Sequence, residues 1–423
     1  MAFSSTSAPE LRSNMGCRLR AWLSLGICLC LTEMVQAADV KFVGKVEHEG
    51  SEAIAFRLEG EINDTDPAGV KAALAKARIG NDGEVWPSIV VELDSSGGSY
   101  QSGLDLALLF RRLGLATVVK SGDHCFSACA LAFLGGTQRA TDPTPASDDG
   151  PIPDQLPDRS IERDAQLGFH APYLALSGSA YTADNVSEAY TAAVLGISRF
   201  IAIADHLYVS TAELPKLLKP TRDDLYMADN VDAVRFLGID YTDNTQQIRN
   251  LHGITPTMVL NACVNRYYHL RGRSSLLGYG TAASVREEFI EGSKLLENGE
   301  EKQVFGIRRV KYGEGSTNVA FTPIAKTDDG RSFVWCLFGP IGADATTIYK
   351  PAGTVEELFA ELKNGQGQWW EFSSSATSMR IGRSDAMVSM MRVFDMAPPE
   401  TKLADVGQTM EQYRVNEPIL PQR

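Results

Sequence analysis

The sequence predicts an α/β fold with a parallel-sheet core, followed by a second, α+β domain. Three observations indicate the core: a β-branched apolar run at residues 88–93, an amphipathic helix pattern at residues 99–113, and a short apolar run at residues 116–119. Strand, helix and strand in this order are typical of parallel crossovers. Because 423 residues exceed one typical domain, a second domain is expected.

The first 37 residues have the pattern of a secretory signal peptide. Three arginines within the first 20 residues precede an apolar run at residues 21–31, and Val35-Gln36-Ala37 precedes Ala38. This order predicts cleavage after Ala37 and a periplasmic or secreted protein. The apolar run is short for a membrane span, so no stable span is expected after cleavage; an uncleaved anchor is the alternative.

The composition restricts the partners of the chain. Its formal net charge is −13 at pH 7, and loss of residues 1–37 removes three arginines and two glutamates, which makes the charge −14. An acidic surface without a run of Lys and Arg is unfavourable for nucleic acid. We therefore expect no nucleic-acid partner.

Four cysteines follow the predicted signal peptide: Cys125, Cys129, Cys263 and Cys336. An even number of cysteines in an oxidising compartment allows disulfides, which would pair Cys125 with Cys129 and Cys263 with Cys336. The alternative for the first two is that they are small buried residues that pack a helix. No His/Cys cluster has the spacing of zinc ligands, so no metal is expected.

The remaining elements of the first domain, residues 38–245, are predicted in order. Residues 53–62 alternate like a strand, Asp64-Thr65-Asp66-Pro67 predicts the start of a helix at 68–77, and residues 128–133 form a buried helix. The Pro/Asp-rich residues 137–164 predict an inserted loop, which is either disordered or a lid over a site. Residues 184–206 predict a long helix with an apolar stripe.

Residues 246–397 predict the second domain, of α+β class. After a linker at 246–250, helices are expected at 257–268 and 283–298, and strands at 302–312, 317–324 and 332–338. Residues 398–423 are acidic and contain proline, which indicates a mobile tail.

Two segments of the first domain form a candidate hydrolase site. In Asp94-Ser95-Ser96-Gly97-Gly98-Ser99, directly after the strand at 88–93, adjacent glycines let backbone N–H groups point toward a ligand and stabilise an oxyanion. In His124-Cys125-Phe126-Ser127-Ala128-Cys129-Ala130, Ser127 lies at the start of a helix, beside free N–H groups and a dipole that favours negative charge.

These segments resemble the proteolytic subunit of the Clp protease. The Gly97-Gly98 segment is similar to that family's Asn-Ser-Pro-Gly-Gly, and the Ser127 segment is similar to its Ala-Ser-Met-Gly-Ala nucleophile turn. The likeness is greater to periplasmic members of the Clp-protease/crotonase superfamily, which carry a Cys-x-Ser-Ala-Cys motif. The ordered series of matching elements covers about residues 40–245, roughly half of the chain.

The resemblance implies a Ser-His-Asp triad. Ser127 would be the nucleophile and His170, in a segment similar to Met-Ile-His-Gln-Pro, its general base. Residues 221–228 resemble Glu-Arg-Asp-x-Phe-x-Ser-Ala, which makes Asp224 the residue that orients the histidine; one extra residue leaves Asp223 as the alternative. The N–H groups of Gly98, or Gly97, and of Ala128 would form the oxyanion hole.

The function that the resemblance implies is an exported serine peptidase that hydrolyses peptides or unfolded protein segments and needs no cofactor. The family also implies a homo-oligomer paired through a handle helix at 184–206, although packing within one chain explains the same stripe. A crotonase-type acyl-CoA enzyme is disfavoured by the secretory signal, since CoA chemistry is cytoplasmic. A catalytically inactive binding or assembly scaffold is the alternative from another class, which the insertion and the second domain fit.

Overall fold

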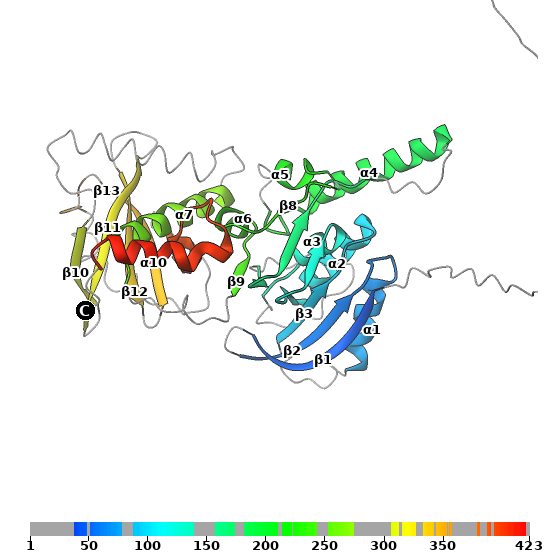
Figure 1. Cartoon of the computed structure of the whole chain (residues 1–423), viewed down its shortest axis with the longest axis horizontal. Coiled ribbons are helices and arrows are strands. Elements are labelled where there is room, and N and C mark those ends of the chain that lie inside the picture. The colour runs from blue at the N-terminus through cyan, green and yellow to red at the C-terminus, as the bar shows by residue number, and fades with distance from the viewer. Residues whose placement is uncertain are drawn as a thin grey trace, which may run out of the picture. The chain divides into compact units, whose positions relative to one another are not determined.

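The computed structural model of the chain describes most residues between Ala38 and Ile419 (Figure 1). The described ranges are 38–48, 51–77, 88–138, 157–173, 182–209, 214–221, 223–242, 253–274, 306–312, 315–326, 333–341, 344–352, 354, 356–357, 379–380, 387–390 and 393–419. Residues from Gln36 onward form one compact unit, whose buried cluster draws side chains from both sides of the predicted domain boundary at 245, such as Leu237 and Met258. The predicted signal peptide lies outside the described residues.

A six-stranded, mainly parallel sheet forms the core that the sequence predicts. Its first two strands are antiparallel and the others pair in parallel. The order is β1 (Asp39–His48), β2 (Ser51–Glu59), β3 (Ser88–Asp94), β4 (Ala116–Val119), β6 (Arg159–Glu162) and β9 (Asp240–Thr242). The mixed α/β class is therefore confirmed.

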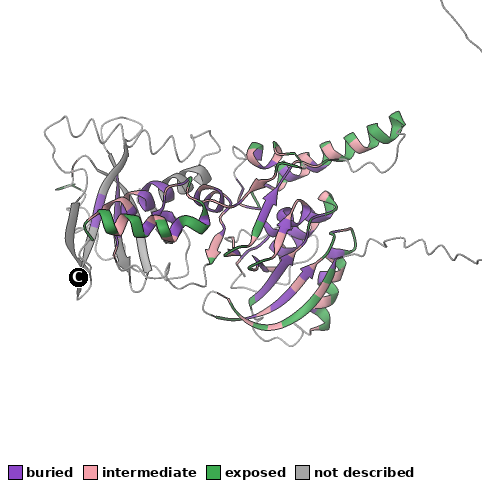
Figure 2. Ribbon diagram, viewed as in Figure 1, coloured by how far each residue is buried: buried purple, intermediate pink, exposed green. Residues whose placement is uncertain are grey.

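Three helices pack their apolar residues into the core beside this sheet. They are α1 (Asp66–Lys76), α2 (Tyr100–Leu113) and α3 (Ala128–Phe133). The Ser99 hydroxyl accepts a hydrogen bond from the Ser102 N–H at 3.3 Å and caps α2, whereas Gly114, at φ 64°, ends it. All six residues of α3 are buried, as the purple ribbon shows (Figure 2). The burial of α3 fixes the position of Ser127, which directly precedes it.

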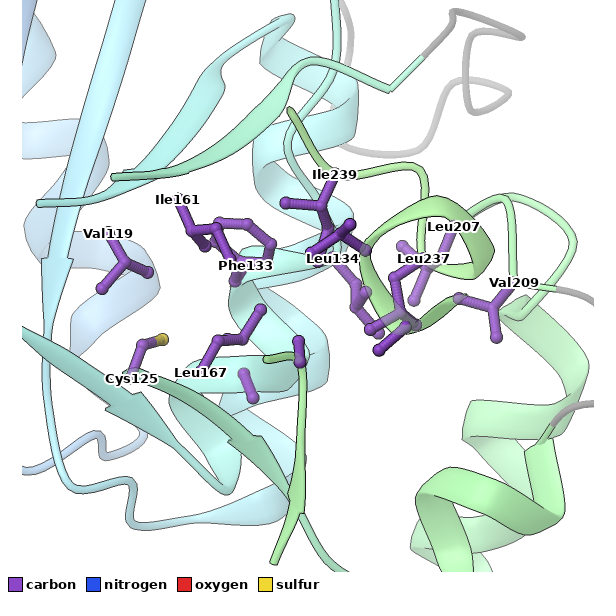
Figure 3. Packing of buried hydrophobic residues seen from close by; sticks show 14 of the residues in the cluster. Val119, Cys125, Phe133, Leu134, Ile161, Leu167, Leu207, Val209, Leu237 and Ile239 are labelled. Atoms are coloured by element: carbon purple, nitrogen blue, oxygen red, sulfur yellow. The ribbon is translucent and has the colours of Figure 1, made fainter. Parts of the chain in front are cut away.

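A second, three-stranded sheet positions the candidate site. Its order is β5 (His124–Phe126), β7 (Gln166–Phe169) and β8 (Tyr226–Met227), with β5 parallel and β8 antiparallel to β7. Cys125 and Leu167 are paired in register and point into the same apolar core as Phe133 and Ile161 (Figure 3). The sequence does not predict β5, because three residues are too few for a periodic pattern.

The long helix α4 (Ala183–Ile203) is capped and largely exposed. Thr182 and Asn185 form a capping box at its start. Among the described residues, α4 is the one helix that is long and apolar enough to cross a membrane, judged by length and composition. Only 11% of its most apolar 18-residue stretch is buried inside the protein. The short helices α5 (Leu214–Leu218) and α6 (Val231–Phe236) follow. Much of α4 is drawn as green, exposed ribbon (Figure 2).

The C-terminal segment contains a helix and an antiparallel sheet. The helix is α7 (Pro256–Ser274), and the disulfide between Cys263 and Cys336 joins it to the sheet. The sheet order is β10 (Gly306–Tyr312), β11 (Gly315–Lys326), β12 (Phe333–Ile341), β13 (Asp344–Ala352), β15 (Met387–Met390) and β14 (Met379–Arg380). The three predicted strands correspond to β10, β11 and β12. The predicted linker at 246–250 and helix at 283–298 lie outside the described residues.

Two expectations are corrected by packing that the sequence pattern does not reveal. The tail expected to be mobile contains the 3-10 helix η3 (Leu403–Asp405) and helix α10 (Val406–Asn416), in which Val406 and Met410, four residues apart, are buried. The Thr257 N–H also donates to the Glu417 carboxylate at 3.0 Å. These contacts dock the tail.

The second correction concerns the inserted loop expected at residues 137–164. Its last part is β6, which pairs with β4 and β9. Arg159 in β6 is buried and its guanidinium donates to the carbonyl oxygens of Leu134 at 2.7 Å and Leu207 at 3.1 Å. Arg159 is therefore accommodated in the core by hydrogen bonds to backbone carbonyl oxygens. Residues 139–156 lie outside the described residues.

Candidate active site

Ser127 forms a sharp, strained turn between a strand and a helix. It follows β5, directly precedes α3, and has φ 56° and ψ −119°. A non-glycine residue with positive φ is uncommon and costs about 1–3 kcal/mol, and such strain clusters at functional sites. A strained strand-to-helix turn is the context in which hydrolases hold a nucleophilic serine. The partly exposed Ser127 side chain fits that context.

The surrounding structure holds this turn in place from three sides. The Ser127 N–H donates to the Gly168 carbonyl oxygen at 3.0 Å, and the Ser127 carbonyl accepts from the Leu131 N–H at 3.2 Å. A disulfide joins Cys125 to Cys129, two residues before and two residues after the serine, and both cysteines are fully buried. The strained conformation is therefore fixed by the next strand, by α3 and by a covalent link.

The glycine pair lies directly against this turn. Gly97 has φ 110°, and a Cβ at that position would lie 2.6 Å from the Ser127 Cβ and 3.2 Å from the Ser127 Oγ. Gly98 has φ 143°, and a Cβ there would lie 2.2 Å from the carbonyl oxygen of Ile62. Both positions thus require glycine for space as well as for conformation. The glycine loop predicted to form an oxyanion hole is therefore in contact with Ser127.

Hydrogen bonding distinguishes the two glycines as donors. The Gly97 N–H donates to the Ser95 Oγ at 3.1 Å, and the buried Ser95 hydroxyl lies 3.3 Å from the Gly97 carbonyl oxygen, to which it donates. Within the described part of the chain, neither the Gly98 N–H nor the Ala128 N–H, the first of α3, donates a hydrogen bond. Gly98 and Ala128 therefore retain the two donors that an oxyanion needs.

His170 follows the strand beside the serine. Because β5 and β7 are parallel and Phe126 is paired with Gly168, Ser127 and His170 both lie just beyond the carboxyl ends of neighbouring strands. His170 is 9% exposed, and its Nδ1 lies 2.7 Å from the Ala171 carbonyl oxygen. A carbonyl oxygen can only accept, so this bond places the proton on Nδ1 and leaves the Nε2 lone pair of a neutral ring free to act as a base.

The carboxylates predicted to orient His170 lie farther along the same small sheet. Asp223 and Asp224 precede β8, which pairs with β7 through Phe169 and Tyr226. Both aspartates are exposed, and in the described ranges no hydrogen bond joins either of them to His170, nor His170 to Ser127. The structure thus brings the serine turn and the glycine pair into contact and places His170 and the aspartates on adjacent strand ends. Catalytic hydrogen bonds of unliganded enzymes often tighten only when substrate binds.

A charged network that the sequence analysis missed supports the glycine loop. The Asp94 carboxylate, at the end of β3, accepts from Arg57 Nη2 at 2.8 Å, from the His124 N–H at 3.3 Å, and lies 3.1 Å from the His124 Nδ1. The hydrogen bond to Asp123 raises the pKa of the Arg57 guanidinium, and the negative charges of Asp123 and Asp94 raise it further. Burial acts in the opposite direction. The sequence signal for this network was that Asp94 and His124 are the first residues of the two site segments.

The described residues contain no group of three or more His, Cys, Asp or Glu side chains that could hold a metal ion. The groups that the structure places at the site are the Ser127 hydroxyl, the His170 imidazole and backbone N–H donors. No family model matches this chain, and no curated protein matches it.

Proposed function

We propose that this protein is an exported serine peptidase with a core like that of the Clp-protease/crotonase superfamily. It hydrolyses peptides or unfolded protein segments with Ser127 as the nucleophile. The observation that carries the proposal is the strained turn at Ser127, braced by a disulfide and placed against a glycine loop with a free N–H group. Two disulfides in the chain support an oxidising compartment.

The first half of the reaction forms an acyl-enzyme. The Ser127 Oγ attacks the carbonyl carbon of the scissile peptide while the His170 Nε2 takes the proton of the Ser127 hydroxyl. Negative charge develops on the carbonyl oxygen, where the N–H groups of Gly98 and Ala128 stabilise it; one such donor contributes about 3 kcal/mol. His170 then gives the proton to the leaving amine.

The second half releases the product. Water attacks the ester carbonyl as His170 takes its proton, and the Ser127 oxygen leaves with a proton from the same imidazole. Throughout, the ring needs a fixed orientation, to which the bond from Nδ1 to the Ala171 carbonyl contributes. Asp224, with Asp223 as the alternative, is the proposed third member, since both lie within three residues of the start of β8, the strand that pairs with β7 next to His170.

Labelling with a fluorophosphonate probe tests the nucleophile. We expect the mature protein to react at one serine, identified as Ser127 by mass spectrometry, and Ser127→Ala to lose the label. Ser96→Ala is the matched control, because Ser96 is an exposed serine in the glycine loop and should be dispensable. Labelling that survives in Ser127→Ala, or that maps to another residue, would exclude this nucleophile.

Variants of the other groups define the base and its partner. His170→Ala should lose labelling. Whichever of Asp224→Asn and Asp223→Asn loses labelling as well is the third member of the triad. If both aspartate variants keep full labelling, the imidazole is oriented by the Ala171 carbonyl alone and the site is a dyad.

An inactive binding or assembly scaffold is the second candidate. The observation that favours it is the exposure of Asp223 and Asp224, which make no hydrogen bond to His170 among the described residues. If the protein is a scaffold, it should be folded by circular dichroism, should not be labelled by fluorophosphonate and should not hydrolyse unfolded casein. The Ser127→Ala variant should bind the partner as tightly as the wild-type protein does.

The proposed assembly is a homo-oligomer that pairs through α4. Apolar side chains at helical spacing on this helix are exposed, among them Val186, Tyr190, Val194 and Ile201. Because Asp184 and Glu188 leave this helix with more acidic than basic residues, a second copy of the chain suits it better than an anionic membrane surface.

A further inference from the structure

Asp66 is a buried carboxylate that has no cationic side-chain partner among the described residues. It is the first residue of α1 and is 2% exposed. Its Oδ2 accepts from the Asn63 N–H at 2.7 Å, whereas its Oδ1 is buried and accepts no hydrogen bond. No described Lys, Arg or His side chain forms an ion pair with it. An ionised carboxylate is rarely buried without a counter-charge, because burial without one is costly.

The backbone of Ala38 lies against this carboxylate. Ala38 is 9% exposed and belongs to the same buried cluster as Val70 and Leu74 of α1. A backbone hydrogen bond from Ala38 is among the influences that lower the pKa of Asp66. Ala38 is also the residue that follows the cleavage position predicted from the signal-peptide pattern, although that prediction used no structural information.

We infer that Asp66 is the receptor for the new N-terminus, and that cleavage after Ala37 completes a buried ion pair between the Ala38 α-ammonium and the Asp66 carboxylate. This inference is independent of the proposed peptidase function. It assigns a processing site and gives a reason for a buried acid that the described part of the chain otherwise leaves without a counter-charge.

The chemistry of cleavage supplies what Asp66 lacks. A signal peptidase and one water molecule break the Ala37–Ala38 peptide bond, which leaves a carboxylate on Ala37 and, after proton uptake, an ammonium on Ala38. The amide has one N–H and no net charge. The ammonium has three N–H groups and a full positive charge, so it can keep the existing bond and also reach the unpartnered Oδ1.

The surroundings of Asp66 favour its charged form once that cation is present. The positive end of the α1 dipole lies at Asp66. Burial raises the pKa of Asp66 above its ordinary value, while the bonds from Asn63 and Ala38 lower it and the exposed Asp64 raises it slightly. An ammonium in contact would oppose the effect of burial directly.

The reactivity of the new α-amino group tests this pair. The full chain is exported with its own leader, and the intact mass of the product is measured. A start at Ala38 is expected, and a start at another residue would overturn the inference. The folded product is then treated with formaldehyde and cyanoborohydride at pH 7, and the rate of dimethylation at Ala38 is measured by mass spectrometry.

We expect Asp66→Asn to increase that rate about tenfold or more, since a carboxylate partner raises an amine pKa by about one unit or more and only the neutral amine reacts. Asp64→Asn is the matched control, because it removes an exposed acid two residues away; its rate should equal that of the wild-type chain. Equal rates in the wild-type chain and Asp66→Asn would overturn the inference.

A second measurement covers the case in which Asp66→Asn does not fold. A mature chain with one glycine inserted before Ala38 keeps Asp66 and the Ala38 amide but moves the ammonium away. Its Tm should be lower by about 2–4 °C or more. An unchanged Tm would mean that the ammonium makes no buried pair.

Discussion

Gly97 and Ser127 are in such close contact that a methyl group on the glycine would lie 2.6 Å from the Cβ of the serine. The two residues are 30 positions apart in the sequence. They meet because Ser95, just past the end of β3, forms a parallel β-bridge with Cys125 through backbone hydrogen bonds. This pairing brings the glycine loop alongside the serine turn. The proposed nucleophile and the proposed oxyanion hole are thus parts of one packed unit.

This contact predicts the effect of Gly97→Ala. The substitution should reduce fluorophosphonate labelling strongly and lower the free energy of unfolding, because the new Cβ meets Ser127 and, at 2.9 Å, the Phe126 carbonyl oxygen. The steric part is about 1–3 kcal/mol beyond the cost of the backbone conformation. Gly122→Ala is the control, since φ is 84° there and a Cβ would meet nothing within 4 Å. If both variants lose the same stability and keep full labelling, the contact is unimportant.

Ser95→Ala tests the hydrogen bond that fixes the glycine loop. The variant leaves the buried Gly97 N–H without its acceptor at 3.1 Å, which should cost about 1–3 kcal/mol and slow labelling of Ser127. Asn230→Ala is a control of comparable stability loss, about 1 kcal/mol, because Asn230 caps α6 through the Ala233 N–H at 2.9 Å. Labelling rates and urea unfolding would be measured on both. Equal labelling rates would show that Ser95 does not position the loop.

The two disulfides should have opposite effects on stability and activity. The double variant Cys125→Ala, Cys129→Ala removes a disulfide that closes a loop of sequence separation 4. By its effect on the entropy of the unfolded chain, that disulfide contributes about 2 kcal/mol to the free energy of unfolding. We expect labelling of Ser127 to be lost. The double variant Cys263→Ala, Cys336→Ala removes a disulfide that closes a loop of sequence separation 73 and contributes about 4 kcal/mol to the free energy of unfolding. This variant should keep the labelling of Ser127. The measurements are thermal unfolding and probe labelling. Undiminished labelling in the first pair would show that the disulfide does not brace the turn.

Glu92 on β3 predicts a pH-dependent change in stability. Burial raises the pKa of this carboxyl, while Lys120 and Arg57 lower it. The pKa of Glu92 in the folded protein exceeds the unfolded value of about 4.3. The free energy of unfolding therefore falls as the pH rises from the unfolded pKa to the folded pKa, and it stays at the lower value at higher pH. Glu92→Gln should therefore raise the free energy of unfolding at pH 8, and the gain should shrink as the pH falls toward 4.3.

Urea unfolding at several pH values measures this difference. Glu47→Gln, at an exposed position of β1, is the control and should change stability by less than about 0.5 kcal/mol. A gain in Glu92→Gln that is the same at every pH would contradict the explanation by burial.

The exposed stripe of α4 predicts the effect of a charge on assembly. Tyr190→Glu, at a side chain that is 69% exposed, should lower the mass measured by light scattering, because it places a charge in the proposed interface, and should leave Tm nearly unchanged. Leu195→Glu is the control, since Leu195 is also exposed, at 63%, but lies away from the stripe by helical spacing. A monomeric wild-type protein that binds vesicles would point to a membrane surface as the occupant of α4.

The sequence alone determined the elements that depend on local patterns. The β-branched run at β3, the apolar face of α2 and the small-residue helix α3 all follow from side-chain periodicity and capping. The same patterns indicate Ser127 at a helix start and the adjacent glycines after a strand. These features are local because each depends on residues within one turn or one strand.

Only the tertiary structure decided how these segments meet. Gly97 contacts Ser127, and Ala38 contacts Asp66, through pairings between residues far apart in the chain, which local propensity does not encode. The docked α10 and the buried Arg159 depend on partners supplied by distant segments. The short β5, too brief for any period, became a strand because Ser95, just past the end of β3, and β7 offer it hydrogen-bond partners on both sides.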